Sequence, residues 1–140
     1  MRPIVPDASV LIKWSLPEGA EEDQNTAKEL LEELAYERIR VMVPALWYFE
    51  VGNTLARKYP DQADASLQHL QSILQDCVAE ASQECRRRTI DLVRRHRVTF
   101  YDASYHALAI IHDGVFVTAD EKYLQAVAGE PNLMHLKDWR

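Results

Sequence analysis

"RPIVPDASVLIKW", residues 2–14, places a carboxylate inside an apolar segment. Ile4 and Val5 precede Asp7, and a second apolar run begins at Val10. A carboxylate near a core is costly unless it is paired, hydrogen-bonded or bound to a metal. We therefore predict a buried strand over residues 3–7 that ends at Asp7, and the sequence must provide Asp7 with a polar or charged partner.

Short apolar strands alternate with helical hydrophobic periods along the rest of the chain. Further strands are predicted over residues 39–44, 77–81, 115–118 and 133–136, and helices over residues 23–38, 45–58, 61–74, 82–93, 102–113 and 121–128. Pro44 suits the first turn of the second helix, Asp61 or Asp64 is expected to cap the third, and Ser82 and Asp120 are expected to cap later ones. The alternation predicts one domain spanning residues 1–140, an α/β fold with three layers, α/β/α, around a central parallel sheet.

Composition narrows the class of protein. The chain has 140 residues and a formal net charge of −6, so any contact with nucleic acid must be local, or must come from a metal or a basic partner. No apolar run approaches the roughly 18 residues of a membrane span, and no secretory signal is expected. Cys77 and Cys85 do not have the spacing of a disulfide framework, and we expect two thiols in a reducing cytoplasm.

Four acids each interrupt or end an apolar segment: Asp7, Glu50, Asp102 and Asp120. Each has an ordinary explanation. Asp7 suits a turn, Glu50 a solvated helix face, and Asp102 and Asp120 suit helix N-caps. Taken together they indicate a site, because ligands in parallel sheets bind beyond the carboxyl ends of the strands. Asp7 and the Thr118–Asp120 pair fall at such ends.

Several carboxylates at one edge would repel each other, and a divalent cation removes that repulsion. An all-oxygen ligand set without His or Cys favours Mg²⁺, or Mn²⁺, over Zn²⁺. Mg²⁺ held by a few carboxylates keeps waters, which suits the attack of water on a phosphodiester. Asn53 lies one turn after Glu50 and is a candidate to orient a carboxylate or a water. Ser9 and Thr118 are candidates to hydrogen-bond Asp7 and Asp120 respectively.

Four segments resemble the motifs of the PIN-domain family in order and spacing, and are similar to its bacterial VapC-type toxins. They are "PDASVLIKW", "PALWYFEVGNTL", "TFYDASYHALAI" and "FVTADEKYLQA". The resemblance runs from Val5 to about Leu136. It implies that Asp7, Glu50, Asp102 and Asp120 form the metal-dependent catalytic site. It also implies an endoribonuclease that acts on RNA, is usually a homodimer and is neutralised by a cognate antitoxin.

Other features have less specific readings. The basic stretch of residues 85–97 offers Arg86, Arg87, Arg94 and Arg97 to RNA phosphates, or forms a solvated face that balances nearby acids. Phosphate contacts are also candidate roles for Lys13, Arg57 and Lys58. His106 is expected to be structural rather than a general base. The aromatic group Trp14, Trp47, Tyr48 and Phe49 is expected in the core or a dimer interface rather than under RNA bases.

Three rival functions remain at this point. A phosphoaccepting receiver domain needs an adjacent acidic pair after its first strand, and a haloacid-dehalogenase-type phosphatase needs DxD where this chain has "DAS". A non-catalytic PIN-like module for RNA binding or protein interaction would keep the fold alone. The complete set of four acids argues against that module, because an idle site has no reason to hold costly carboxylates together.

Overall fold

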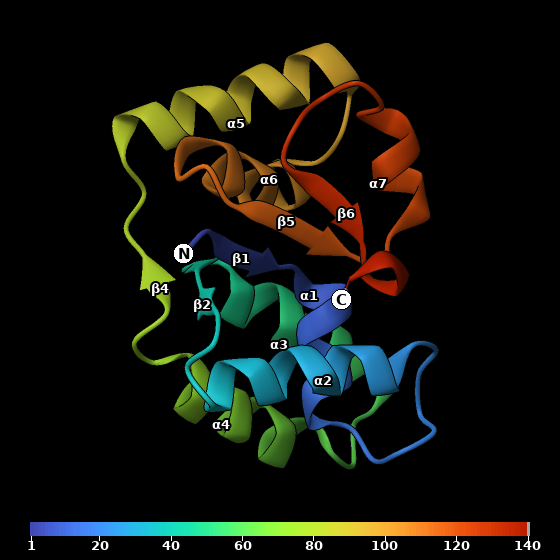
Figure 1. The fold of residues 1–140 in the computed structure, drawn as a ribbon. Coiled ribbons are helices and arrows are strands. Elements are labelled where there is room, and N and C mark those ends of the chain that lie inside the picture. The colour runs from blue at the N-terminus through green and yellow to red at the C-terminus, as the bar shows by residue number, and fades with distance from the viewer. Residues whose placement is uncertain (140) are drawn as a thin grey trace.

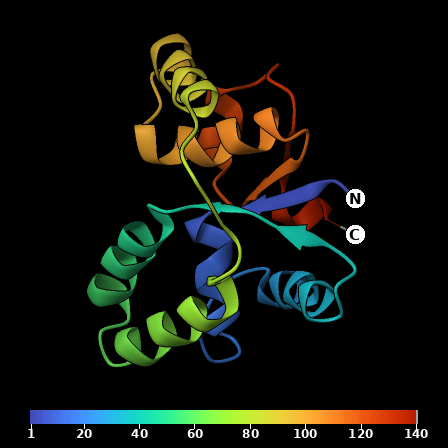
Figure 2. The ribbon, with the colours of Figure 1, turned by 90° about the vertical axis from the view of Figure 1, so that its left-hand side faces the viewer.

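A computed structural model describes residues 1–139. Its central sheet contains four strands in the order β2-β1-β5-β6, and all neighbouring pairs are parallel. These strands are β1 (Pro3–Pro6), β2 (Arg40–Val41), β5 (Val115–Thr118) and β6 (Leu133–His135). Helices cover both faces of the sheet, so the predicted α/β/α arrangement is confirmed (Figures 1 and 2).

The two helical layers have different origins along the chain. One face carries α1 (Ala8–Ser15), α2 (Gln24–Ala35), α3 (Trp47–Lys58) and α4 (Ala63–Leu74). The other carries α5 (Gln83–His96), α6 (Phe100–Ile111) and α7 (Glu121–Ala126) (Figures 1 and 2). A short 3₁₀ helix, η1 (Leu136–Asp138), follows β6. No helix within residues 1–139 is long and apolar enough to cross a bilayer.

Helix α1 is the element that the sequence analysis did not predict. Its residues are buried almost all round, Lys13 and Trp14 included. A helix that is hidden on every side has no polar stripe, so the amphipathic period that reveals surface helices is missing. As a result Asp7, expected at the end of a strand, also forms the N-cap of the helix that follows at once.

The strand predicted over residues 39–44 is wrong in one respect, because it is two strands in two sheets. The Met42 N–H donates to the Ile4 carbonyl at 3.0 Å, whereas the next N–H, from Val43, donates to the Cys77 carbonyl at 3.0 Å. Strand β3 (Val43–Pro44) pairs with β4 (Val78–Ala79) in a separate two-stranded sheet. Pro44 therefore ends a strand, and helix α3 begins three residues later at Trp47.

Helix starts differ from expectation at two places. Gln62, rather than Asp61 or Asp64, occupies the N-cap position of α4, without a side-chain cap. Thr99 caps α6 by accepting from the Asp102 N–H at 3.1 Å, which leaves Asp102 in the first turn with its carboxylate free of capping. Ser82 and Asp120 cap α5 and α7 as predicted. Both cysteines are free thiols.

Gly114 shows how closely the two halves of the chain approach. It connects α6 to β5, and a Cβ atom there would lie 2.3 Å from the Pro3 carbonyl oxygen. Only glycine fits against the backbone of β1 at this point. The contact brings β5 alongside β1, with Ile4 opposite Val115 and Pro6 opposite Val117. The carboxyl ends of the two strands, and the polar residues that follow them, thereby come to one edge.

Candidate active site

Asp7 is held at the carboxyl end of β1 by hydroxyl groups from two segments. The Ser9 hydroxyl and backbone N–H donate to its Oδ1 at 2.5 and 3.0 Å. The Thr118 hydroxyl, from the end of β5, donates to its Oδ2 at 2.5 Å. Both carboxylate oxygens thus have partners, and the expected role of Ser9 beside Asp7 matches these contacts.

The same two hydroxyls organise the turn that carries Asp120. Ser9 Oγ accepts from the Ala119 N–H at 2.9 Å, and Thr118 Oγ1 accepts from the Asp120 N–H at 3.0 Å. The Thr118 hydroxyl was expected to reach the Asp120 carboxylate, but it donates to Asp7 instead. The Asp120 carboxylate caps α7 by accepting from the Tyr123 N–H at 3.2 Å. Asp7 and Asp120 are therefore joined through shared hydroxyl groups.

Burial makes ionised Asp7 unfavourable. The residue is 5 % exposed, and burial raises the pKa of its carboxyl to about 7. The hydrogen bonds from Ser9 and Thr118 oppose this rise in pKa, and the charges of Glu50 and Asp102 add to it. A carboxyl in this state gains from a nearby cation, because a positive charge favours its ionised form.

Glu50 and Asp102 approach the same edge from the two helical layers. Glu50 lies in the first turn of α3 and Asp102 in the first turn of α6. Burial raises the pKa of both carboxyls. The charge of Asp120 raises the pKa of both further, and the charge of Asp102 adds to the rise at Glu50. The charges of Glu50 and Asp102 act on Asp7, and the charge of Asp120 acts on Glu50 and Asp102, so the four acids share one edge. Within residues 1–139 they do not form a compact group.

One oxygen of Glu50 is in an unusual position. Its Oε1 is buried and has no hydrogen-bond partner among the described residues, and the same is true of the Tyr105 hydroxyl. The two groups are close enough for Tyr105 to lower the pKa of Glu50 against the effect of burial, yet they do not meet in a well-oriented hydrogen bond. Tyr105 is not among the residues expected at the site from the sequence. Its spacing of three residues from Asp102 on a helix was the available signal.

The carboxylate oxygens suit a hard divalent cation, but the four carboxylates are not close enough together to share one metal ion. Within residues 1–139, no group of three or more His, Cys, Asp or Glu side chains is arranged closely enough to hold a metal ion. Burial and the charges of neighbouring carboxylates nevertheless raise the pKa of Asp7, Glu50 and Asp102, and one buried carboxylate oxygen, Glu50 Oε1, lacks a partner among the described residues. Oxygen ligands of this kind are those that Mg²⁺ and Mn²⁺ prefer.

Asn53 and His106 lie in very different surroundings. Asn53 is exposed, and its side chain makes no hydrogen bond within the described part of the chain. His106 is fully buried between the Tyr123 hydroxyl and the Pro131 carbonyl, each 2.8 Å from a ring nitrogen. A carbonyl only accepts, so Nε2 carries the proton and Nδ1 accepts from Tyr123. Burial lowers the pKa of His106, which keeps the ring neutral.

The aromatic group divides between core and surface. Trp14 and Trp47 are buried and Tyr48 is half-buried, as expected for core residues, but Phe49 beside Glu50 is 71 % exposed. Lys13 is also buried, and its Nζ pairs with Glu21 Oε1 at 3.1 Å. Arg57 and Lys58 are exposed in the last turn of α3.

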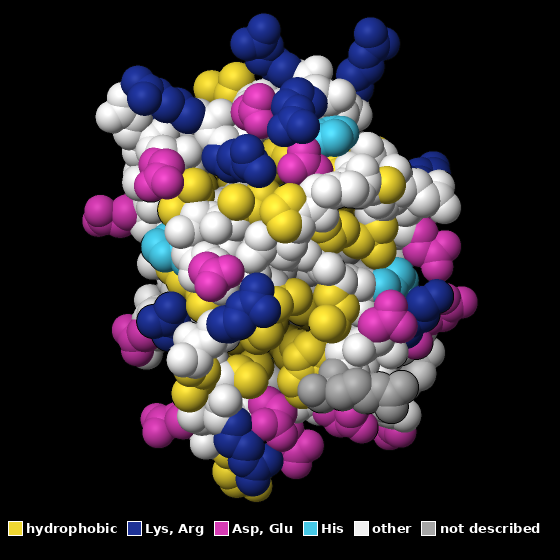
Figure 3. Space-filling model, turned by 45° about the horizontal axis from the view of Figure 1, so that its top comes forward, with side chains coloured by type: hydrophobic (Ala, Val, Ile, Leu, Met, Phe, Trp, Pro, Cys, Tyr) yellow, Lys and Arg dark blue, Asp and Glu magenta, His cyan; other side chains and the backbone are white. Residues whose placement is uncertain are grey.

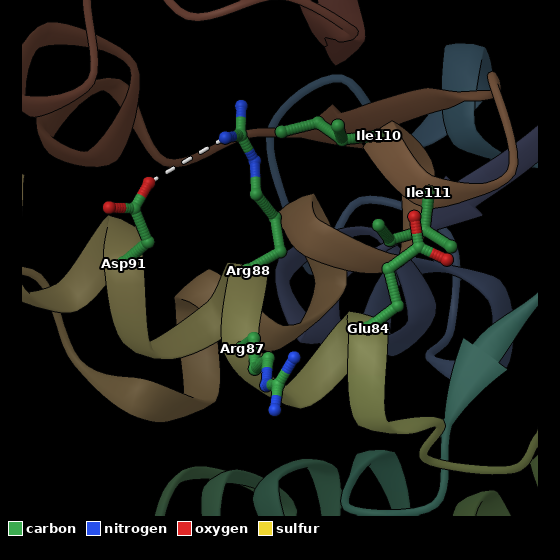
Figure 4. A pocket seen from close by; sticks show the side chains of 6 residues that line it. All are labelled: Glu84, Arg87, Arg88, Asp91, Ile110 and Ile111. Carbon is green, nitrogen blue, oxygen red and sulfur yellow. Dashed lines mark ion pairs between the residues drawn. The ribbon is translucent and has the colours of Figure 1, made fainter.

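The basic residues of α5 lie away from the acids. Lys and Arg side chains gather at the upper end of the molecule in Figure 3, where α5 runs. A hollow of about 480 Å³ between α5 and α6 contains none of the four site acids (Figure 4). Within it, Arg88 pairs with Asp91 at 3.6 Å, and it also pairs with Glu130 at 3.5 Å. The arginines of α5 that pair with acids are Arg88 and Arg95. The ion pairs within residues 1–139 include none of the four candidates for RNA phosphates, Arg86, Arg87, Arg94 and Arg97.

A second hollow, of about 630 Å³, adjoins Asp120 directly. Its wall combines basic with acidic side chains: Lys13, Lys122, Lys137, His135, Glu22, Asp23, Asp120 and Glu121. The hollow therefore offers positive groups next to a candidate metal ligand, despite the negative net charge of the chain.

Comparisons with known proteins agree with the fold. Residues 4–130 match the family model described as PIN domain. No curated protein sequence matches the chain. Similar solved structures include a toxin-antitoxin complex from Klebsiella pneumoniae, 20 % identical, with a TM-score of 0.65 and coverage of 95 % of this chain and 97 % of that one.

Two further structures have lower identity and similar coverage. Mycobacterium tuberculosis VapC20, a Sarcin-Ricin loop cleaving toxin, is 16 % identical over 92 % of this chain and 97 % of its own, with a TM-score of 0.66. VapBC2 from Rickettsia felis, bound to a promoter DNA fragment, is 15 % identical over 99 % of both chains, also with a TM-score of 0.66. At these identities the likeness concerns the fold.

Proposed function

Because the chain belongs to the PIN-domain family, we propose that it is a Mg²⁺-dependent endoribonuclease and the toxin of a toxin–antitoxin pair. One observation supports this most directly: four acids from separate elements share an edge of the sheet, and burial raises the pKa of Asp7 there to about 7. Mn²⁺ is expected to replace Mg²⁺, because both prefer carboxylate oxygens.

The chain's own residues divide the work of such a site. Asp7, Glu50, Asp102 and Asp120 would hold the cation, which when bound supplies an activated water and offsets the charge of the phosphodiester. Ser9 and Thr118 orient Asp7 by donating to its two oxygens. In the hollow beside Asp120, Lys122 and Lys137 would contact RNA phosphates next to the one that is cleaved. Asn53 is exposed one turn after Glu50, and its proposed role is to orient a water molecule.

An antitoxin is the proposed protein partner, in line with the toxin-antitoxin complexes among the similar structures. The acidic edge and the net charge of −6 suit a basic segment of that partner. An Arg from it would pair with the carboxylates and exclude the metal, since guanidinium binds carboxylate in a bidentate manner. We expect the chain to form a homodimer and to work in the cytoplasm.

Cleavage of RNA by the purified chain tests the proposal. We expect cleavage with Mg²⁺ or Mn²⁺, none with EDTA, and none with the matched variant Asp102→Asn in either metal. Cleavage that persists after thorough chelation, or in Asp102→Asn, would exclude the metal mechanism. RNA binding without cleavage by the wild-type chain would favour the non-catalytic module, for which the dispersed carboxylates are the supporting observation.

A further inference from the structure

Buried polar atoms without partners mark places where a structure is incomplete without a further contact. Four such side-chain atoms occur in the described residues, and two of them, Glu50 Oε1 and the Tyr105 hydroxyl, belong to the candidate site. They come from different helices, α3 and α6, which cover opposite faces of the sheet. Two unpartnered groups with complementary donor and acceptor roles thus lie near each other at the acidic edge.

The position of the Tyr105 hydroxyl is fixed by its ring. Tyr105 is fully buried, and its ring stacks on Phe116 of β5 with centroids 6.3 Å apart and an interplanar angle of 17°. The ring has no room to turn toward solvent, so the hydroxyl stays directed at the site. Glu50, by contrast, is half-buried in the first turn of α3.

The surroundings also fix the protonation of Tyr105. Burial raises the pKa of its hydroxyl, and the charges of Glu50, Asp7 and Asp102 raise it further. A protonated tyrosine hydroxyl donates one hydrogen bond. The Tyr105 hydroxyl has no hydrogen-bond partner within residues 1–139. It could therefore donate to the Glu50 carboxylate if that carboxylate shifted toward it.

We propose that Tyr105 is a positioning residue for Glu50, whose carboxylate accepts a hydrogen bond from the Tyr105 hydroxyl when Glu50 takes part in the metal site. The proposal rests on the proposed function. In metal sites the carboxylate ligands are held by hydrogen bonds of this kind, and removal of such a partner typically lowers metal affinity about 10- to 100-fold.

The variant Tyr105→Phe separates this role from a structural one. It removes a buried hydroxyl that has no partner, so in EDTA its melting temperature should equal or exceed that of the wild type. Its affinity for Mn²⁺, measured from the rise of the melting temperature with metal concentration, should fall about tenfold or more. The control Tyr59→Phe removes a hydroxyl that is bonded to Glu21. It should lower the melting temperature and leave Mn²⁺ affinity unchanged.

A double-mutant cycle with Glu50→Gln identifies the partner. If Tyr105 acts through Glu50, adding Tyr105→Phe to Glu50→Gln should change Mn²⁺ affinity by less than twofold. Equal Mn²⁺ affinity of Tyr105→Phe and wild type, lower stability of Tyr105→Phe in EDTA, or additive effects in the cycle would each overturn the proposal. A wild type whose melting temperature does not respond to Mn²⁺ would instead defeat the proposed function, and the role of Tyr105 with it.

Discussion

The two sides of the acidic edge are built differently. On the side of β1 and β5, Asp7 has a hydroxyl donor on each of its oxygens, and those hydroxyls also bind the turn that carries Asp120. On the side of α3 and α6, Glu50 Oε1 and the Tyr105 hydroxyl are buried without partners. One side is organised by the fold itself, and the other keeps its polar groups available for a further contact.

Stability and chemistry conflict at this site in two ways. A buried polar group without a partner destabilises a fold by about 1–3 kcal/mol. A buried carboxyl with a raised pKa likewise destabilises it at neutral pH, even when well hydrogen-bonded. Two effects therefore destabilise the fold at this edge: a buried carboxylate repelled by its neighbours on one side, and missing hydrogen bonds on the other. A bound cation would reduce the repulsion and give Glu50 a contact.

The largest expected effect comes from Asp7→Asn, which tests the organised side. Loss of a carboxylate ligand should reduce RNA cleavage by orders of magnitude. Asn still caps α1 and carries no charge, so in EDTA at pH 8 the variant should be more stable than wild type, on the order of 1–3 kcal/mol. Denaturant melts and cleavage assays measure the two effects. A variant that is both less stable and active would make Asp7 a structural residue only.

The hydroxyl donors provide the next largest effect. Ser9→Ala and Thr118→Val each remove a hydrogen bond to Asp7 and one to the β5–α7 turn. We expect Mn²⁺ affinity to fall about 10- to 100-fold in either variant. Unlike Tyr105→Phe, both should also lose stability in EDTA, because each leaves a partly buried backbone N–H without its partner. If all three variants behaved alike in EDTA, the contrast between the two sides would be wrong.

The pH dependence of stability gives the smallest effect and isolates Asp7. Between pH 3.8 and about 7, folded Asp7 binds a proton that the unfolded chain has lost, so its contribution to stability rises as pH falls through this range. His106 acts in the opposite direction below pH 6.5, because burial lowers its pKa in the folded state. The contribution of His106 is common to wild type and Asp7→Asn and cancels in their difference.

The stability advantage of Asp7→Asn over wild type in EDTA should therefore shrink as the pH is lowered from 8 to 5. Urea denaturation at several pH values measures this difference. An advantage that is constant with pH would show that Asp7 is ionised throughout the range, contrary to its burial.

The sequence pointed to acids on both sides of the edge, but it did not point to Tyr105. Asp7 was identified because a carboxylate in an apolar segment is costly unless it has a partner. Ser9 and Thr118 were identified because each lies two residues from one of the predicted acids. Tyr105 did not stand out, because an aromatic residue on an apolar helix is ordinarily core. Whether its hydroxyl finds a partner depends on how α3 and α6 meet across the sheet, which no local pattern contains.

The fold also differs from the sequence-based predictions where tertiary contacts, rather than local patterns, decide the structure. Helix α1 was missed because its residues are buried on all sides. Asp102 was expected as a possible cap, but Thr99, three residues earlier, takes that place with its own hydroxyl. The apolar run of residues 39–44 showed no sign of a break, since both of its halves are strands and only their partners differ.

That change of partner makes two adjacent amides independent reporters. The Met42 N–H is bonded to β1 in the main sheet, and the Val43 N–H is bonded to the segment that precedes β4. In hydrogen–deuterium exchange, Met42 would follow the opening of the central sheet, and Val43 the opening of the small sheet next to α3 and Glu50. If the small sheet opens more readily, Val43 will exchange sooner than its neighbour.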